Sequence, residues 1–211
     1  MPGGWTLSGA WLPMCGQTWA GAAASFVAMW AVMMVAMMLP SLVPLLWRLR
    51  LEPGAAAAFG ASYFLVWTLL GVLIFALVAA FGQLALAIPA VARTAPGLVA
   101  FAVLAAGAYQ FTAAKARQLA CCRQGGAPDL AGAGAAWRHG LRFGLHCIRA
   151  CAGLTTMLLA IGVMDLRAMA LVAAATTAER LAPAGEYVAW MVGTASLVAG
   201  VYLLTGAAWM S

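Results

Sequence analysis

The sequence opens with a run that contains no charged side chain before Arg48, and a second uncharged run covers residues 53–92. A transmembrane α-helix needs about 20 consecutive apolar residues, so each run is long enough to cross a bilayer. The whole chain is 66% hydrophobic and only 8% charged, whereas a soluble domain carries roughly 25% charged residues. These features predict an all-α, polytopic membrane helix bundle and exclude a soluble domain.

Apolar segments alternate with short stretches that contain charged residues, glycine or proline along all 211 residues. We expect about six transmembrane helices in a single integral membrane domain of residues 1–211, at about 19–47, 57–88, 96–119, 137–163, 166–181 and 187–209. Residues 1–18 contain no Lys or Arg, which a cleaved signal peptide needs at its start. The first apolar run is therefore interpreted as a retained helix.

The basic residues are distributed unevenly over the loops of this six-helix arrangement. With the N-terminus outside, the cytoplasmic loops and helix ends contain Arg48, Arg50, Lys115, Arg117, Arg123, Arg138, Arg142 and Arg180. The outer loops then contain only Arg93 and Arg167. Because cytoplasmic loops carry an excess of Lys and Arg, this pattern predicts that both termini are outside. The same bias explains the net charge of +6, so we expect no nucleic-acid partner.

Four cysteines and one histidine lie close together in the second half of the chain. Cys147 and Cys151 are four residues apart, so on a helix they share a face, where two thiolates can chelate one ion. Cys121 and Cys122 are adjacent at the end of the third expected helix, and His146 borders the Cys147 face. Thiolates with an occasional imidazole select Cu(I), zinc or iron–sulfur centres. The alternative is that these cysteines pack between helices as small apolar residues.

Methionines gather in the first expected helix, at Met29, Met33, Met34, Met37 and Met38. Helical spacing spreads them over about half of the circumference, so some should face the bundle and others lipid or another helix. Thioethers are soft ligands for Cu(I), and Met33 and Met37 are candidate ligands on a path to the cysteines. The alternative is that methionine fills irregular helix interfaces as a flexible apolar side chain.

Two charged residues, Arg149 and Glu179, are expected inside or near the hydrocarbon region on consecutive antiparallel helices. A charge inside a membrane helix is costly and is normally paired or faces a polar cavity. We therefore expect an Arg149–Glu179 ion pair, with the alternative that Arg149 extends alone to the headgroups. Asp165 is expected to cap the fifth helix.

Three segments carry a resemblance to one family. Residues 29–41 form a Met-rich segment that ends in Leu-Pro-Ser, and Lys115 is followed seven residues later by Cys122-Arg123. Residues 144–180 contain Gly144, Cys147, Cys151, the turn Gly-Val-Met at 162–164 and the pair Glu179-Arg180. Together they resemble an uncharacterised bacterial family of predicted metal-binding integral membrane proteins, defined by a domain of unknown function. The resemblance covers the chain from the first to the fifth expected helix and implies a bacterial inner (cytoplasmic) membrane protein.

The chain departs from the family pattern at two expected cysteines. Gln118 stands where the first cysteine of the Lys-x-x-Cys-Leu-x-x-Cys-Arg pattern would be, and Ala150 replaces one cysteine of the Gly-x-x-Cys-x-Gly-Cys-Cys segment. Arg149 also replaces its glycine. Cys121 and His146 are available as substitutes. These departures imply a metal site with fewer cysteine ligands than the family pattern has.

The sequence contains no nucleotide-binding loop, nucleophile elbow or paired-carboxylate motif, which favours a protein that is not an enzyme. Our leading hypothesis is a multi-pass membrane protein that handles a soft metal through the Cys/His cluster near the cytoplasmic side. Copper is the foremost candidate metal and zinc the second. The first alternative is a non-catalytic structural or accessory subunit that packs on other membrane protein subunits. The second is a membrane thiol redox protein.

Overall fold

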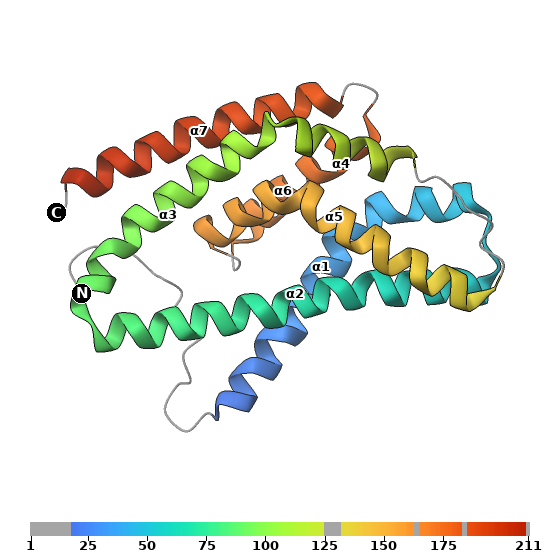
Figure 1. The fold of residues 1–211 in the computed structure, drawn as a ribbon, viewed down its shortest axis with the longest axis horizontal. Coiled ribbons are helices and arrows are strands. Elements are labelled where there is room, and N and C mark those ends of the chain that lie inside the picture. Colours follow the sequence, from blue (N-terminus) through green and yellow to red (C-terminus); the bar gives the residue numbers. More distant parts are fainter. Residues whose placement is uncertain (1–17, 125–131, 163–164, 183–184, 210–211) are drawn as a thin grey trace.

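The computed structural model describes residues 18–124, 132–162, 165–182 and 185–209, and every regular element in these ranges is an α-helix (Figure 1). The helices are α1 (Trp19–Leu49), α2 (Pro53–Ala87), α3 (Pro89–Gln110), α4 (Ala113–Gln124), α5 (Ala133–Ile161), α6 (Leu166–Leu181) and α7 (Gly185–Trp209). The expected all-α helical bundle is confirmed. Residues 1–17, whose lack of Lys and Arg argued against a cleaved signal peptide, lie outside the described residues.

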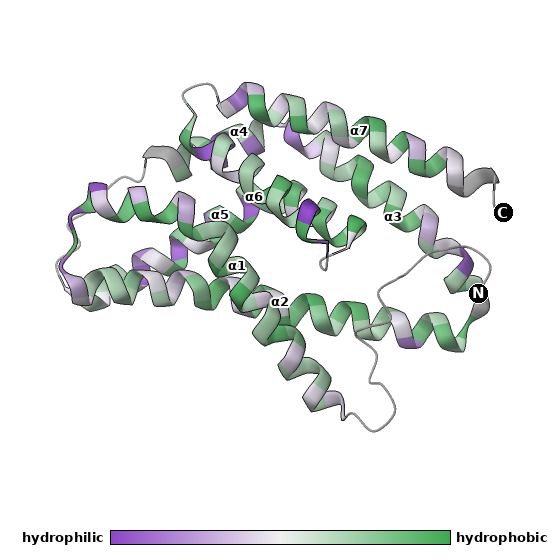
Figure 2. Ribbon diagram, turned by 180° about the vertical axis from the view of Figure 1, so that it is seen from behind, coloured by the Kyte–Doolittle hydropathy of each residue, from purple (hydrophilic) through white to green (hydrophobic). Residues whose placement is uncertain are grey.

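Five of the described helices, α1, α2, α3, α5 and α7, are long and apolar enough to cross a membrane. Large apolar side chains are exposed along them, for example Leu69 and Leu77 on α2 and Phe101 on α3. Figure 2 shows hydrophobic residues along much of α2, α3 and α7, and hydrophilic residues around α4 and at several helix ends. A surface of this kind suits contact with lipid more than contact with water.

The helices form two long pairs that enclose a shorter helix. α2 packs along α5, and α3 packs along α7. The short helix α6 lies between these pairs and contacts α1, α5 and α7, while α4 packs on α5 and α6 (Figure 1). Side chains at the C-terminal end of α6 are therefore enclosed by the helices around it.

The single helix expected at residues 96–119 is two helices in the structure. α3 begins at Pro89, ends at Gln110, and is capped by the N–H of Phe111, which donates to the carbonyls of Ala108 and Tyr109. The hydroxyl of Thr112 then accepts a hydrogen bond from the backbone N–H of Lys115 at 3.2 Å, which is the geometry of a helix N-cap. This break gives α4 its own direction.

The fifth expected helix, at residues 166–181, is α6, which has 16 residues. It is not among the five helices that meet the length of a membrane span in the described part of the chain. Its N-cap is Asp165, whose carboxylate accepts from the N–H groups of Arg167 at 2.8 Å and Ala168 at 3.3 Å. The predicted capping role of Asp165 is confirmed.

Close packing of α5 on α2 depends on two glycines. A Cβ atom at Gly140 would lie 2.5 Å from the carbonyl oxygen of Phe59, and one at Gly144 would lie 3.1 Å from the Cβ of Val66. Small residues at four-residue spacing let two helix backbones approach closely. This approach brings the next residues of α5 against Tyr63 of α2.

Candidate metal site

Two buried thiols on α5 form the centre of the site. The side chain of Cys147 is 0% exposed and that of Cys151 is 2% exposed, and both are free cysteines. They are one helical turn apart and lie on the same buried face of α5. The structure therefore places the two thiols together, as their four-residue spacing predicted.

Arg180 of α6 contacts both thiols. Its Nη2 donates to the Sγ atom of Cys147 and, at 3.4 Å, to the Sγ atom of Cys151. Its Nη1 donates to the hydroxyl of Ser41 on α1 at 2.9 Å. The side chain is 8% exposed, and its Nε has no hydrogen-bond partner among the described residues. A guanidinium thus lies directly against a dithiol inside the bundle.

Tyr63 closes the site from the side of α2. Its hydroxyl oxygen lies 2.8 Å from the Sγ atom of Cys147, and its ring is completely buried. Tyr63 of α2 and Arg180 of α6 contact the thiols of α5, and Ser41 of α1 contacts Arg180. The site therefore depends on the packing of four helices.

A buried ion pair lies beside the dithiol site, at the residue that precedes Arg180 on α6. The ammonium of Lys115 on α4 is 2.7 Å from Oε2 of Glu179, and the two side chains are 1% and 2% exposed. Lys115 also donates to the carbonyl of Ala150, and Nε2 of Gln110 donates to Glu179 at 3.5 Å. These contacts join α3, α4, α5 and α6.

The expected Arg149–Glu179 ion pair is wrong, because the partner of Glu179 is Lys115. Arg149 is exposed, and its backbone carbonyl accepts a hydrogen bond from the hydroxyl of Tyr109 at 3.1 Å. Arg149 is two residues from both Cys147 and Cys151, which turns it about 200° away from their face. It therefore points out of the bundle.

The adjacent cysteines of α4 face different environments. Cys122 is buried and Cys121 is exposed. Burial raises the pKa of the Cys122 thiol to about 11, although the Arg180 cation acts in the opposite direction. Cys122 therefore lies near the dithiol as a neutral thiol, whereas Cys121 faces away from it.

His146 does not join the buried thiols. Its Nδ1 lies 2.7 Å from Oε1 of Gln118 on α4, in a half-buried position. In the ranges that the structure describes, no group of three or more His, Cys, Asp or Glu side chains is arranged to hold one metal ion. The expected site therefore narrows from a Cys/His cluster to the pair Cys147 and Cys151.

The methionines of α1 face inward to a greater extent than their spacing suggested. Met33, Met34, Met37 and Met38 are all buried in the same apolar cluster as Cys147 and Cys151. Ser41, which contacts Arg180, lies one turn beyond Met37 on α1. A row of thioethers thus runs along α1 toward the dithiol.

The donor atoms of the site can be compared with the ligands that a copper ion prefers. Thiolates and thioethers are the soft ligands that hold Cu(I), while hard oxygen ligands suit Mg²⁺ and Ca²⁺. The dithiol supplies two sulfur atoms from α5 with the cation of Arg180 against them, and the buried methionines of α1 belong to the same apolar cluster. This set fits a soft metal cation.

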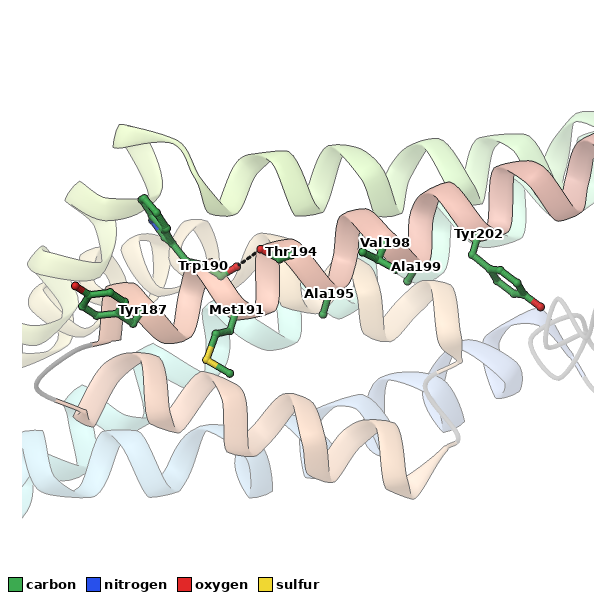
Figure 3. A pocket seen from close by; sticks show the side chains of 8 residues that line it. All are labelled: Tyr187, Trp190, Met191, Thr194, Ala195, Val198, Ala199 and Tyr202. Atoms are coloured by element: carbon green, nitrogen blue, oxygen red, sulfur yellow. Dashed lines mark hydrogen bonds between the residues drawn. The ribbon is translucent and has the colours of Figure 1, made fainter.

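A groove on the outer face of α7 is a separate feature. Its lining side chains lie along one side of that helix, from Tyr187 at one end to Tyr202 at the other (Figure 3). Trp190 and Met191 contribute to it, and Thr194 donates its hydroxyl to the Trp190 carbonyl. The lining contains no thiol and no charged side chain, so it lacks the chemistry of the α5 site.

Sequence reasoning missed Arg180, Tyr63 and Ser41 as members of the site. Arg180 was counted as a loop charge, although its place in the Glu179-Arg180 pair, which is part of the family resemblance, was a usable signal. No sequence motif marks Tyr63 or Ser41 as a member of the site. Their role depends on which helices pack together.

The comparisons with known proteins agree with this chemistry. The model of a family described as "PpoB2: Copper chaperone" matches residues 27–203, from α1 through most of α7. A search of curated proteins found no match, and a search of solved structures found none. The matched range includes every residue of the dithiol site, and it fits the resemblance to a metal-related family. This chain belongs to the PpoB2 copper chaperone family.

Proposed function

We propose that the protein is a multi-pass membrane protein that binds Cu(I) at Cys147 and Cys151 and passes it on. The observation that carries this proposal is the buried dithiol, with both sulfur atoms on one face of α5 and in contact with a guanidinium. Membership of a copper chaperone family supports copper over zinc as the cargo.

The methionines of α1 suit the role of a transfer path. A chaperone must hold its metal firmly enough to exclude water and weakly enough to release it. Neutral thioethers bind Cu(I) more weakly than thiolates and add no charge to the apolar interior. Met33 and Met37 lie on the buried side of α1, and we assign them the steps that precede or follow capture by the thiols.

The membrane orientation is part of the proposal. Lys115 and Arg180 are buried in the bundle, so they no longer count as loop charges. The remaining basic residues still favour the same side, with Arg48, Arg50, Arg117, Arg123, Arg138 and Arg142 against Arg93 and Arg167. We place the protein in a bacterial inner membrane with both termini outside. This orientation needs an even number of crossings, so we assign α6, which contacts α1, α5 and α7, as the sixth crossing.

Copper loading of the purified full-length chain tests the function. The chain in detergent would be loaded with Cu(I) under anaerobic, reducing conditions, freed of excess metal, and analysed for metal per protein. We expect about one equivalent in the unaltered chain, and loss of most of it when Cys147 and Cys151 are both replaced by serine. Cys121→Ser is the matched control, because this thiol is exposed. Equal copper in the double serine variant would overturn the proposal.

A further inference from the structure

When both thiols are protonated, the buried polar groups around the dithiol carry one positive charge in excess. Lys115 and Glu179 neutralise each other at 2.7 Å. In the described part of the chain no carboxylate forms an ion pair with Arg180, whose partners are two sulfur atoms and the Ser41 hydroxyl. Its Nε also lacks a partner among those residues.

A buried charge without an opposite charge is strongly destabilising, because a low-dielectric interior does not replace the lost hydration. Arginine remains protonated in proteins, so it cannot avoid this cost by losing its proton. The site is therefore complete only when an anionic group lies beside Arg180. A dithiol that binds metal supplies such a group.

We infer that Arg180 makes this site selective for a monovalent soft cation over a divalent one. Two thiolates and one Cu(I) ion form a complex with a single negative charge, which the guanidinium neutralises. Two thiolates and one Zn(II) ion form a neutral complex, which leaves Arg180 uncompensated. The inference rests on the proposed copper site at Cys147 and Cys151.

Arg180 also has to move when metal enters, because its Nη2 lies against both sulfur atoms. The two thiols release any remaining protons to the medium as they bind Cu(I), no electron is transferred, and the guanidinium keeps its charge. The contact with Ser41 holds the other end of the guanidinium at 2.9 Å. Arg180 can therefore withdraw from the sulfurs and stay beside the complex as its counter-charge.

The test compares the affinities for Cu(I) and Zn(II), each measured by competition with a chelator of known affinity, on the full-length chain in detergent. We expect Arg180→Gln to lower the ratio of Cu(I) to Zn(II) affinity by at least about tenfold, since it removes the counter-charge. Arg180→Lys restores a cation and should keep the ratio within about threefold. A purely structural role would not be rescued by charge in this way.

A second pair of variants leaves Arg180 in place. Ser41→Asp puts a permanent carboxylate against the guanidinium, and Ser41→Asn has nearly the same shape without the charge. We expect the affinity ratio of the Asp variant to fall at least about tenfold below that of the Asn variant. This comparison decides the inference even if Arg180→Gln fails to fold.

The outcomes separate the inference from the function on which it rests. Equal Cu(I) to Zn(II) ratios in the unaltered chain and in Arg180→Gln, or in the two Ser41 variants, would overturn the role of Arg180 and leave copper binding intact. If the unaltered chain binds no Cu(I), or the double serine variant binds it equally, the proposed function fails first.

Discussion

Replacing Glu179 by glutamine leaves the ammonium of Lys115 in the core without the carboxylate that it contacts at 2.7 Å. Both side chains are almost fully enclosed by α3, α4, α5 and α6, so little water can compensate for the loss. Removing one partner of a buried ion pair costs about 3–5 kcal/mol in the free energy of unfolding, because the other charge stays buried. For a chain of this length, such a loss lowers the melting temperature by on the order of 10 °C.

Thermal unfolding of the detergent-solubilised chain measures this effect. Lys115→Met should be similarly destabilising, since it leaves Glu179 with only Gln110 as its described hydrogen-bond donor. The chain with both changes should lose less stability than the sum of the two single losses, because neither charge then remains without its partner. Arg149→Gln is the matched control and should change the melting temperature little, because Arg149 is exposed.

Two results would refute this reasoning. One is a loss in Arg149→Gln as large as that in Lys115→Met, which would restore Arg149 as the partner of Glu179. The other is strict additivity of the Lys115 and Glu179 changes, which would mean that the two side chains do not interact.

Further predictions concern thiol reactivity, helix packing and topology. A maleimide should label the exposed Cys121 quickly and the buried Cys122 slowly at pH 7.5. The labelling rate at Cys122 should rise about tenfold per pH unit toward its pKa of about 11, because the thiolate is the reactive form. Equal labelling rates at the two thiols would contradict the burial of Cys122. Gly140→Ala should destabilise the bundle by about 1–3 kcal/mol in thermal unfolding, because the added Cβ meets Phe59, whereas Gly134→Ala has open space and should not. A reporter enzyme that is active only outside the cytoplasm should be active when it is fused to either terminus. An inactive fusion at one terminus, together with activity of a cytoplasmic reporter at the same terminus, would contradict the proposed orientation.

The sequence predicted the helical class and the approximate ranges of most helices, because long apolar runs allow little else in a bilayer. The break between α3 and α4 was missed, since apolar residues continue across Phe111. The available signal was Thr112, because threonine is favoured as the N-cap of a helix. In the structure its hydroxyl accepts the backbone N–H of Lys115, three residues later. This break matters for function because Lys115 and Cys122, on the separate helix α4, are buried in the bundle.

The sequence predicted that Cys147 and Cys151 lie together, because residues four apart on one helix share a face. The partner of Glu179 depended on which helix faces α6, and no local pattern contains that information. Arg180 illustrates the same limit, because a basic residue at a helix end has the same sequence pattern whether it faces water or a dithiol. Its burial comes from the contacts of α6 with α1 and α5.

The central claim is that Cys147 and Cys151 hold copper through their sulfur atoms. X-ray absorption at the copper edge of the Cu(I)-loaded, full-length chain tests it most directly, because it reports both the oxidation state and the ligand type. We expect Cu(I) in a shell of sulfur ligands that is lost in the Cys147→Ser, Cys151→Ser chain and kept in Cys121→Ser. A shell of nitrogen or oxygen ligands, or a sulfur shell that survives in the double variant, would contradict the account.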